Sequence, residues 1–150
     1  MSESREELLQ QYGDMRKELL SAIDGLSDEQ MIDPSLDGWS IKDHIAHIAF
    51  WDDLRAAEIV RISAGHESVW KLPPEQDEAL NTLAYTMRRA MSLEQARWEL
   101  EASRQSLLDA ISSATPRGLD ASLYGEAGLH STHEAQHAQW IQRWRAERRI

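Results

Sequence analysis

The chain has 150 residues, a formal net charge of −10 at pH 7 and no cysteine. Such an acidic chain lacks the basic face that binds phosphates, so we expect neither a nucleic acid nor a membrane surface as its partner. The lack of cysteine excludes disulfides and thiolate metal sites, and without a signal peptide or a long apolar stretch we expect a cytoplasmic protein.

The first third of the chain has the periodicity of amphipathic helices. Apolar residues recur at spacings of three and four and predict a helix over 4–24. The dipeptide Asp37-Gly38 is typical of a turn in the loop that follows. A second helix is predicted over 40–64, because Ser40 and Asp43 have the spacing of a capping box.

The rest of the chain predicts two further long helices after a crossover. A shorter helix is expected over 76–90, within that crossover, and long helices are expected over 92–114 and 131–147. Capping-box patterns mark both long helices, at Ser92 and at Ser131 with Glu134 three residues later. Proline and glycine place two loops, over 66–75 and 116–129.

Together these elements predict an all-α fold. Four long helices without a strand indicate a four-helix bundle, with the long crossover between its second and third helices. We expect one domain spanning residues 1–150.

Two histidines in the last predicted helix are the main functional signal. His133 and His137 lie one turn apart on the face that also carries Trp140, Ile141 and Trp144. They are either partly buried histidines bonded to carbonyls or carboxylates, or two ligands of one divalent cation. Two inward imidazoles are costly to bury without partners, and a cation satisfies both rings together.

His47 is the best candidate for a third ligand, since it lies on the apolar side of another helix near Trp51. A hydrogen-bonded core histidine is the alternative. Three neutral imidazoles with open coordination positions would form a reactive centre rather than a closed structural one. His66 and His130 lie outside the predicted helices, and we expect neither to bind metal.

Four other residues are candidates for the surroundings of this site. His44 is expected beside the metal ligands or at the entrance of the site. Trp39 and Trp51 are either bundle core or pocket walls. Asp52 belongs either to a solvated helix face or to the hydrogen-bond partners of a metal ligand.

Several of these residues lie in motifs that resemble a known family. The run Gly38-Trp39-Ser40-Ile41-Lys42-Asp43, then Ala46-His47 and Trp51-Asp52, with His133-x3-His137-x3-Ile141 near the end, resembles the signature of the DinB-like (YfiT-type) superfamily. The resemblance implies an up-down-down-up bundle, a divalent metal bound by His47, His133 and His137, and a homodimer. It also implies either a thiol-dependent S-transferase or isomerase that uses a low-molecular-weight thiol, or a metal-dependent hydrolase.

The functional hypothesis is therefore a metal-dependent enzyme for a small-molecule substrate. Its zinc, nickel or iron ion would activate water or a thiol. One alternative is a non-catalytic, stress-response protein that binds metal or a small ligand. Another is a metal-free bundle that acts through an oligomeric surface.

Overall fold

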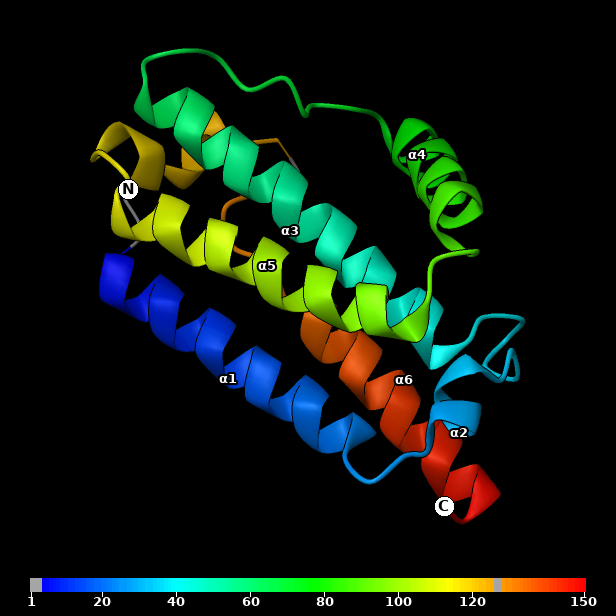
Figure 1. The fold of residues 1–150 in the computed structure, drawn as a ribbon. Coiled ribbons are helices and arrows are strands. Elements are labelled where there is room, and N and C mark those ends of the chain that lie inside the picture. The colour runs from blue at the N-terminus through cyan, green and yellow to red at the C-terminus, as the bar shows by residue number, and fades with distance from the viewer. Residues whose placement is uncertain (1–3, 126–127) are drawn as a thin grey trace.

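A computed structural model describes residues 4–125 and 128–150, and it confirms the all-helical fold (Figure 1). Within those ranges there is no β-strand, and Leu36 and Trp39 form an isolated bridge. The long helices are α1 (Arg5–Ile23), α3 (Ile41–Ser63), α5 (Leu93–Ser112) and α6 (His133–Arg148). Their ends lie within two residues of the predicted ends. Ser40 caps α3 with the predicted capping box. Ser92 caps α5 by accepting from the backbone N–H of Gln95, but the described bonds do not include the return bond that would complete the predicted box.

Shorter elements lie in the connections. Helix α2 (Asp28–Ile32) is not in the sequence prediction, although Ser27 and Gln30 form a complete capping box at its start. Helix α4 (Pro74–Arg88) occupies the crossover and begins two residues early, because proline is favoured in the first turn of a helix. The predicted loop over 116–129 contains two 3-10 turns, Arg117–Leu119 and Ala121–Leu123; its residues 126 and 127 lie outside the described ranges.

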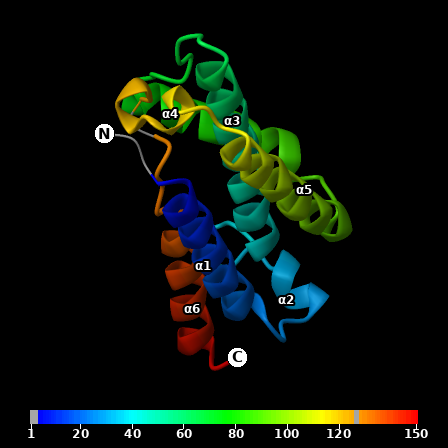
Figure 2. The same cartoon turned by 90° about the vertical axis from the view of Figure 1, so that its left-hand side faces the viewer.

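The long helices pack as two pairs, which Figures 1 and 2 show from two directions. Helix α3 lies along α5, and α1 lies along α6, while α4 lies outside these pairs against α3. The buried apolar side chains form two separate clusters. One contains Leu8, Tyr12 and Ile59, and the other contains Leu19, Ile45 and Ile141.

Between the two apolar clusters lies a network of buried charges, with members from all four long helices. Arg104 of α5 donates from Nε to Asp52 Oδ2 of α3 at 3.0 Å and also bonds Glu134 of α6. Arg16 of α1 donates to Glu134 Oε1 at 2.7 Å and to Asp52 Oδ2 at 3.4 Å. Nη1 of Arg55, also on α3, lies 4.0 Å from Oδ1 of Asp52. Because buried charges need partners, this network fixes the relative positions of the helices.

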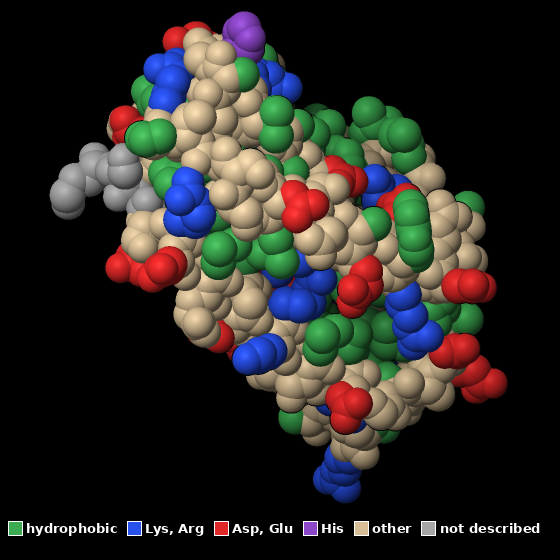
Figure 3. Space-filling model, turned by 60° about the vertical axis from the view of Figure 1, so that its left-hand side comes forward, with side chains coloured by type: hydrophobic (Ala, Val, Ile, Leu, Met, Phe, Trp, Pro, Cys, Tyr) green, Lys and Arg blue, Asp and Glu red, His purple; other side chains and the backbone are tan. Residues whose placement is uncertain are grey.

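The surface differs from this interior. On the face drawn in Figure 3, acidic and basic side chains are interspersed among separate groups of hydrophobic side chains. Among the described residues, no helix combines the length and the hydropathy that crossing a membrane requires.

We expect that removing one partner from the buried network costs far more stability than removing one partner from a surface ion pair. Replacing Arg104 by Met leaves Asp52 and Glu134 with less compensation, and should lower the free energy of unfolding by about 3–5 kcal/mol. Urea denaturation measures this change. The control is Arg97→Met on the same helix, which removes an exposed pair with Asp28 and should cost at most about 1 kcal/mol. Equal losses in the two variants would show that the buried network does not hold the helices together.

Candidate metal centre

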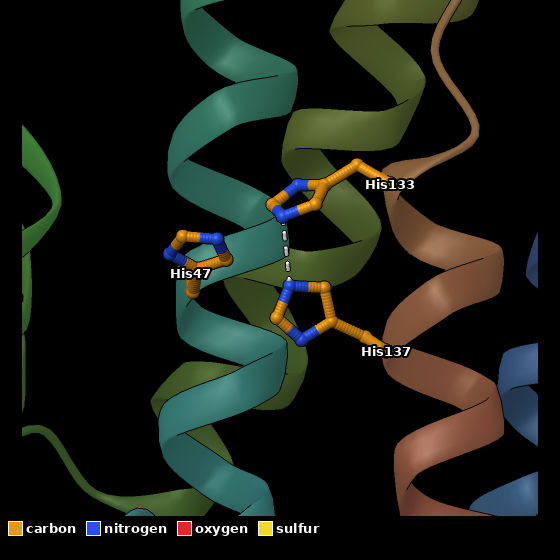
Figure 4. A group of neighbouring side chains, drawn as sticks. All are labelled: His47, His133 and His137. Atoms are coloured by element: carbon orange, nitrogen blue, oxygen red, sulfur yellow. Dashed lines mark hydrogen bonds between the residues drawn. The ribbon is translucent and has the colours of Figure 1, made fainter. Parts of the chain in front are cut away.

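Three imidazoles converge between α3 and α6. Figure 4 shows His47 projecting from α3 toward His133 and His137 of α6. One nitrogen from each ring lies within 4.8 Å of the other two, and the Nε2 atoms of His133 and His137 are 3.1 Å apart. Two nitrogens bound tetrahedrally to one zinc ion lie about 3.3–3.4 Å apart, given bonds of about 2.1 Å. Small ring rotations would therefore let all three histidines hold one ion.

Local sequence places the α3 side of this group. Asp37 and Gly38 both have positive φ, 56° and 86°, so the chain turns tightly and Leu36 pairs with Trp39. Ser40 then starts α3 with the capping box that its spacing with Asp43 predicts. The turn and the cap together set where α3 begins.

The α6 side is placed differently from the prediction. Thr132, not Ser131, is the N-cap of α6, and it makes no side-chain capping bond. The predicted box at Ser131 is wrong because the Glu134 carboxylate turns inward to Arg16 and Arg104. The ion pairs thus hold the first turn of α6, which carries His133.

Burial keeps these imidazoles neutral. His47 and His137 are buried and His133 is half-buried. Desolvation lowers the pKa of His47 to about 3, with smaller contributions from His133 and His44. Desolvation likewise lowers the pKa values of His133 and His137. Neutral imidazole is the form that binds metal, so the three rings need not lose protons at pH 7.

His44 lies against a candidate ligand rather than at an entrance. Its Nδ1 is 2.7 Å from Nδ1 of His137, and its side chain is buried. Trp39 packs edge-on against both His44 and His47, with ring centroids 5.3 and 5.4 Å apart, and stacks on Tyr85 of α4. Trp39 is therefore a wall of the site.

Trp51 packs edge-on against His47, with ring centroids 6.3 Å apart, and Asp52 belongs to the buried charge network. Trp51 stacks on Trp70 with centroids 4.6 Å apart, and its Nε1 donates to Asn81 Oδ1 at 2.6 Å. Asp52 is buried, so it belongs to no solvated face. Its described bonds are to arginines and not to a histidine.

The three histidines border a large cavity of about 850 Å³, whose other walls include Trp39, Tyr85 and Trp140. A second cavity of about 380 Å³ is lined by Trp51, Trp70 and Arg55. His133 and Asn81 border both cavities. In the described chain, the metal-compatible group includes no fourth histidine or carboxylate, which leaves room for water or a substrate.

Sequence reasoning found the three histidines but not all of their neighbours. Asn81 and Tyr85 lie on the crossover helix, where no motif distinguishes them. The sequence did contain a signal for three buried arginines, because each places a charge in an apolar stripe that otherwise faces the core: Arg16, Arg55 and Arg104. His66 and His130 are exposed and lie outside the metal-compatible group.

Comparisons with known proteins give a family and a fold. Residues 11–141 match the family model described as the DinB superfamily. A crystal structure of an uncharacterised protein from Escherichia coli UTI89 is similar, with a TM-score of 0.77 and 18% sequence identity over 98% of this chain and 95% of that chain. At that identity the likeness concerns the fold alone. No curated protein matches the chain.

The buried histidines predict that the metal-free protein loses stability as the pH falls from 6.5 toward 4. In this range the unfolded chain protonates imidazoles that stay neutral in the fold, because burial lowers the pKa of His47 to about 3 and of His44 to about 4. The unfolded state thus binds more protons, and each such histidine costs about 1.4 kcal/mol per pH unit.

Urea denaturation between pH 7 and 4.5 measures this slope. His47→Gln should make the slope shallower, whereas His66→Ala, a change in an exposed loop, should leave it unchanged. A slope that is the same in all three proteins would contradict the burial of neutral His47.

Proposed function

The chain belongs to the DinB superfamily, and from that premise we propose that it is a metal-dependent enzyme acting on a small molecule. His47, His133 and His137 would hold one divalent ion. One observation carries this proposal: three buried or half-buried imidazoles converge beside a large cavity, with no fourth protein ligand in their group among the described residues.

The ion would be zinc, nickel or iron, all of which accept imidazole ligands. When bound, it would polarise a substrate and lower the pKa of a bound water or thiol. The chain's own residues would position the histidines and the substrate, and would exclude water from the cavity. The ion pairs of Glu134 fix the first turn of α6, while the rings of Trp39 and Trp140 make the larger cavity partly apolar.

The two cavities favour a reaction between two organic molecules. Ligand sites have volumes of about 300–1,000 Å³, and both cavities lie in that range. His133 borders each of them, so a reactant in either cavity would lie near the proposed ion. This arrangement suits transfer of a low-molecular-weight thiol to an electrophile. Hydrolysis, which needs one cavity and water, is the second candidate.

Metal analysis tests the site directly. The purified protein, incubated with Zn²⁺ and desalted, should retain one equivalent, as measured by mass spectrometry of the metal. His137→Ala should abolish retention while circular dichroism remains helical, because the three-histidine group loses a member. The control His66→Ala should retain the full equivalent. Stoichiometric zinc in His137→Ala would show that another residue, such as His44, is a ligand.

A reaction screen tests the activity. Protein loaded with zinc, nickel or iron would be incubated with a low-molecular-weight thiol and a panel of electrophiles, and products would be followed by mass spectrometry. A thiol adduct that His47→Ala fails to form supports transfer, whereas products of water addition support the hydrolase. Metal binding without turnover across the panel would favour the non-catalytic stress-response alternative.

The proposal also covers the topology of the bundle, the oligomeric state and the cellular location. We infer that α1, α3, α5 and α6 form one up-down-down-up bundle and one domain. We also infer that a homodimer forms in the cytoplasm through a helix face away from the cavity. Sedimentation that shows only monomer at high micromolar concentration would count against the dimer.

A further inference from the structure

We propose that His44 is a positioning residue for His137, and that its bond serves metal affinity and not the stability of the fold. This inference rests on the proposed metal site. It assigns a function to the one buried imidazole of the cluster that does not belong to the three-ligand group.

The geometry begins with the two nitrogens of the His137 ring. Nε2 lies 3.1 Å from Nε2 of His133, on the side where the three candidate ligands meet. Nδ1 lies 2.7 Å from Nδ1 of His44, across the contact between α6 and α3. Each nitrogen of His137 therefore has a different partner.

Proton bookkeeping then fixes both rings. A neutral imidazole carries one N–H, and a nitrogen that binds metal must offer its lone pair. If His137 binds through Nε2, its proton is on Nδ1 and is donated to Nδ1 of His44. The proton of His44 must consequently lie on its own Nε2. A metal-binding histidine is usually oriented by such a bond from its second nitrogen, and here the acceptor is another histidine.

Among the described residues, His44 is the hydrogen-bond partner of the proton on His137 Nδ1. The rings of Trp39 and Trp140 enclose His44, with centroids 5.3 and 6.4 Å from its own. His44 is only 6% exposed. The described side chains give His137 Nδ1 no second hydrogen-bond partner.

The other nitrogen of His44 indicates why the residue is there. His44 Nε2 is buried and has no hydrogen-bond partner among the described residues. A buried N–H without an acceptor destabilises a fold, so this nitrogen gives no reason to bury a histidine here. The benefit of His44 must then come from its Nδ1, which contacts a candidate metal ligand.

Two substitutions separate these roles. His44→Asn places an amide oxygen near the position of Nδ1 and so keeps an acceptor for His137. His44→Leu fills the space without an acceptor. Zinc affinity would be measured by competition with a fluorescent chelator, and the stability of the metal-free protein by urea denaturation. Nitrogen-15 spectra of the histidine rings would report the tautomer of His137.

We expect His44→Leu to weaken zinc binding by about 10–100-fold, as is usual when such a partner is lost. Its metal-free unfolding midpoint should change little, because the substitution removes the unpartnered Nε2 of His44 but also leaves Nδ1 of His137 without a partner. His44→Asn should bind zinc within about threefold of the unchanged protein, since the acceptor remains. In the zinc-loaded protein, the spectra should show His137 bound through Nε2 and His44 without metal.

Three results would overturn the inference. The first is zinc affinity in His44→Leu equal to that of the unchanged protein. The second is an equal loss of affinity in both variants together with a lower unfolding midpoint, which would make His44 merely structural. The third is a nitrogen-15 shift that shows metal on His44. Each of these results requires that the unchanged protein binds zinc. If the unchanged protein binds no zinc, nickel or iron, the proposed function itself fails, and that outcome is distinct from the three results above.

Discussion

Charged side chains from all four long helices meet at the middle of the structure, where an apolar core would otherwise be continuous. Arg104 and Arg16 reach Asp52 and Glu134 there, and each of these side chains is at most 11% exposed. Burying such charges costs a large desolvation free energy. This cost is offset only if each helix is positioned along its axis so that its charged side chain meets its partners. Sliding one helix by a turn would separate buried charges, whereas apolar side chains could repack at many levels.

The same constraint sets the histidine cluster. Glu134 follows His133 directly and lies one turn before His137, and Asp52 lies five residues after His47. Both carboxylates bond the same two arginines, one on α1 and one on α5. These bonds align α3 with α6, so that the imidazoles of the two helices lie side by side. The network holds charge where partners compensate it, and the neighbouring histidines stay neutral because desolvation opposes their protonation.

The crossover shapes the space around the cluster. Tyr85 and Asn81 lie on α4, and they meet Trp39 and Trp51, which come from or near α3. Helix α4 packs mainly on α3 and lies outside the two helix pairs. None of its described side chains belongs to either of the two apolar clusters. In the proposed enzyme, the long helices would hold the ion, and residues of α4 would form part of the cavity walls.

The sequence by itself determined the four long helices, since apolar spacing, Ser40 and Ser92 caps and the Asp37-Gly38 turn are local features. It also determined that His133 and His137 share a helix face, because a single turn separates them. Only the tertiary structure decided that His47 joins them, that His44 bonds His137, and that Glu134 leaves its predicted cap. These are contacts between residues far apart in the chain. Their geometry depends on how the buried charges align the helices, which no local pattern encodes.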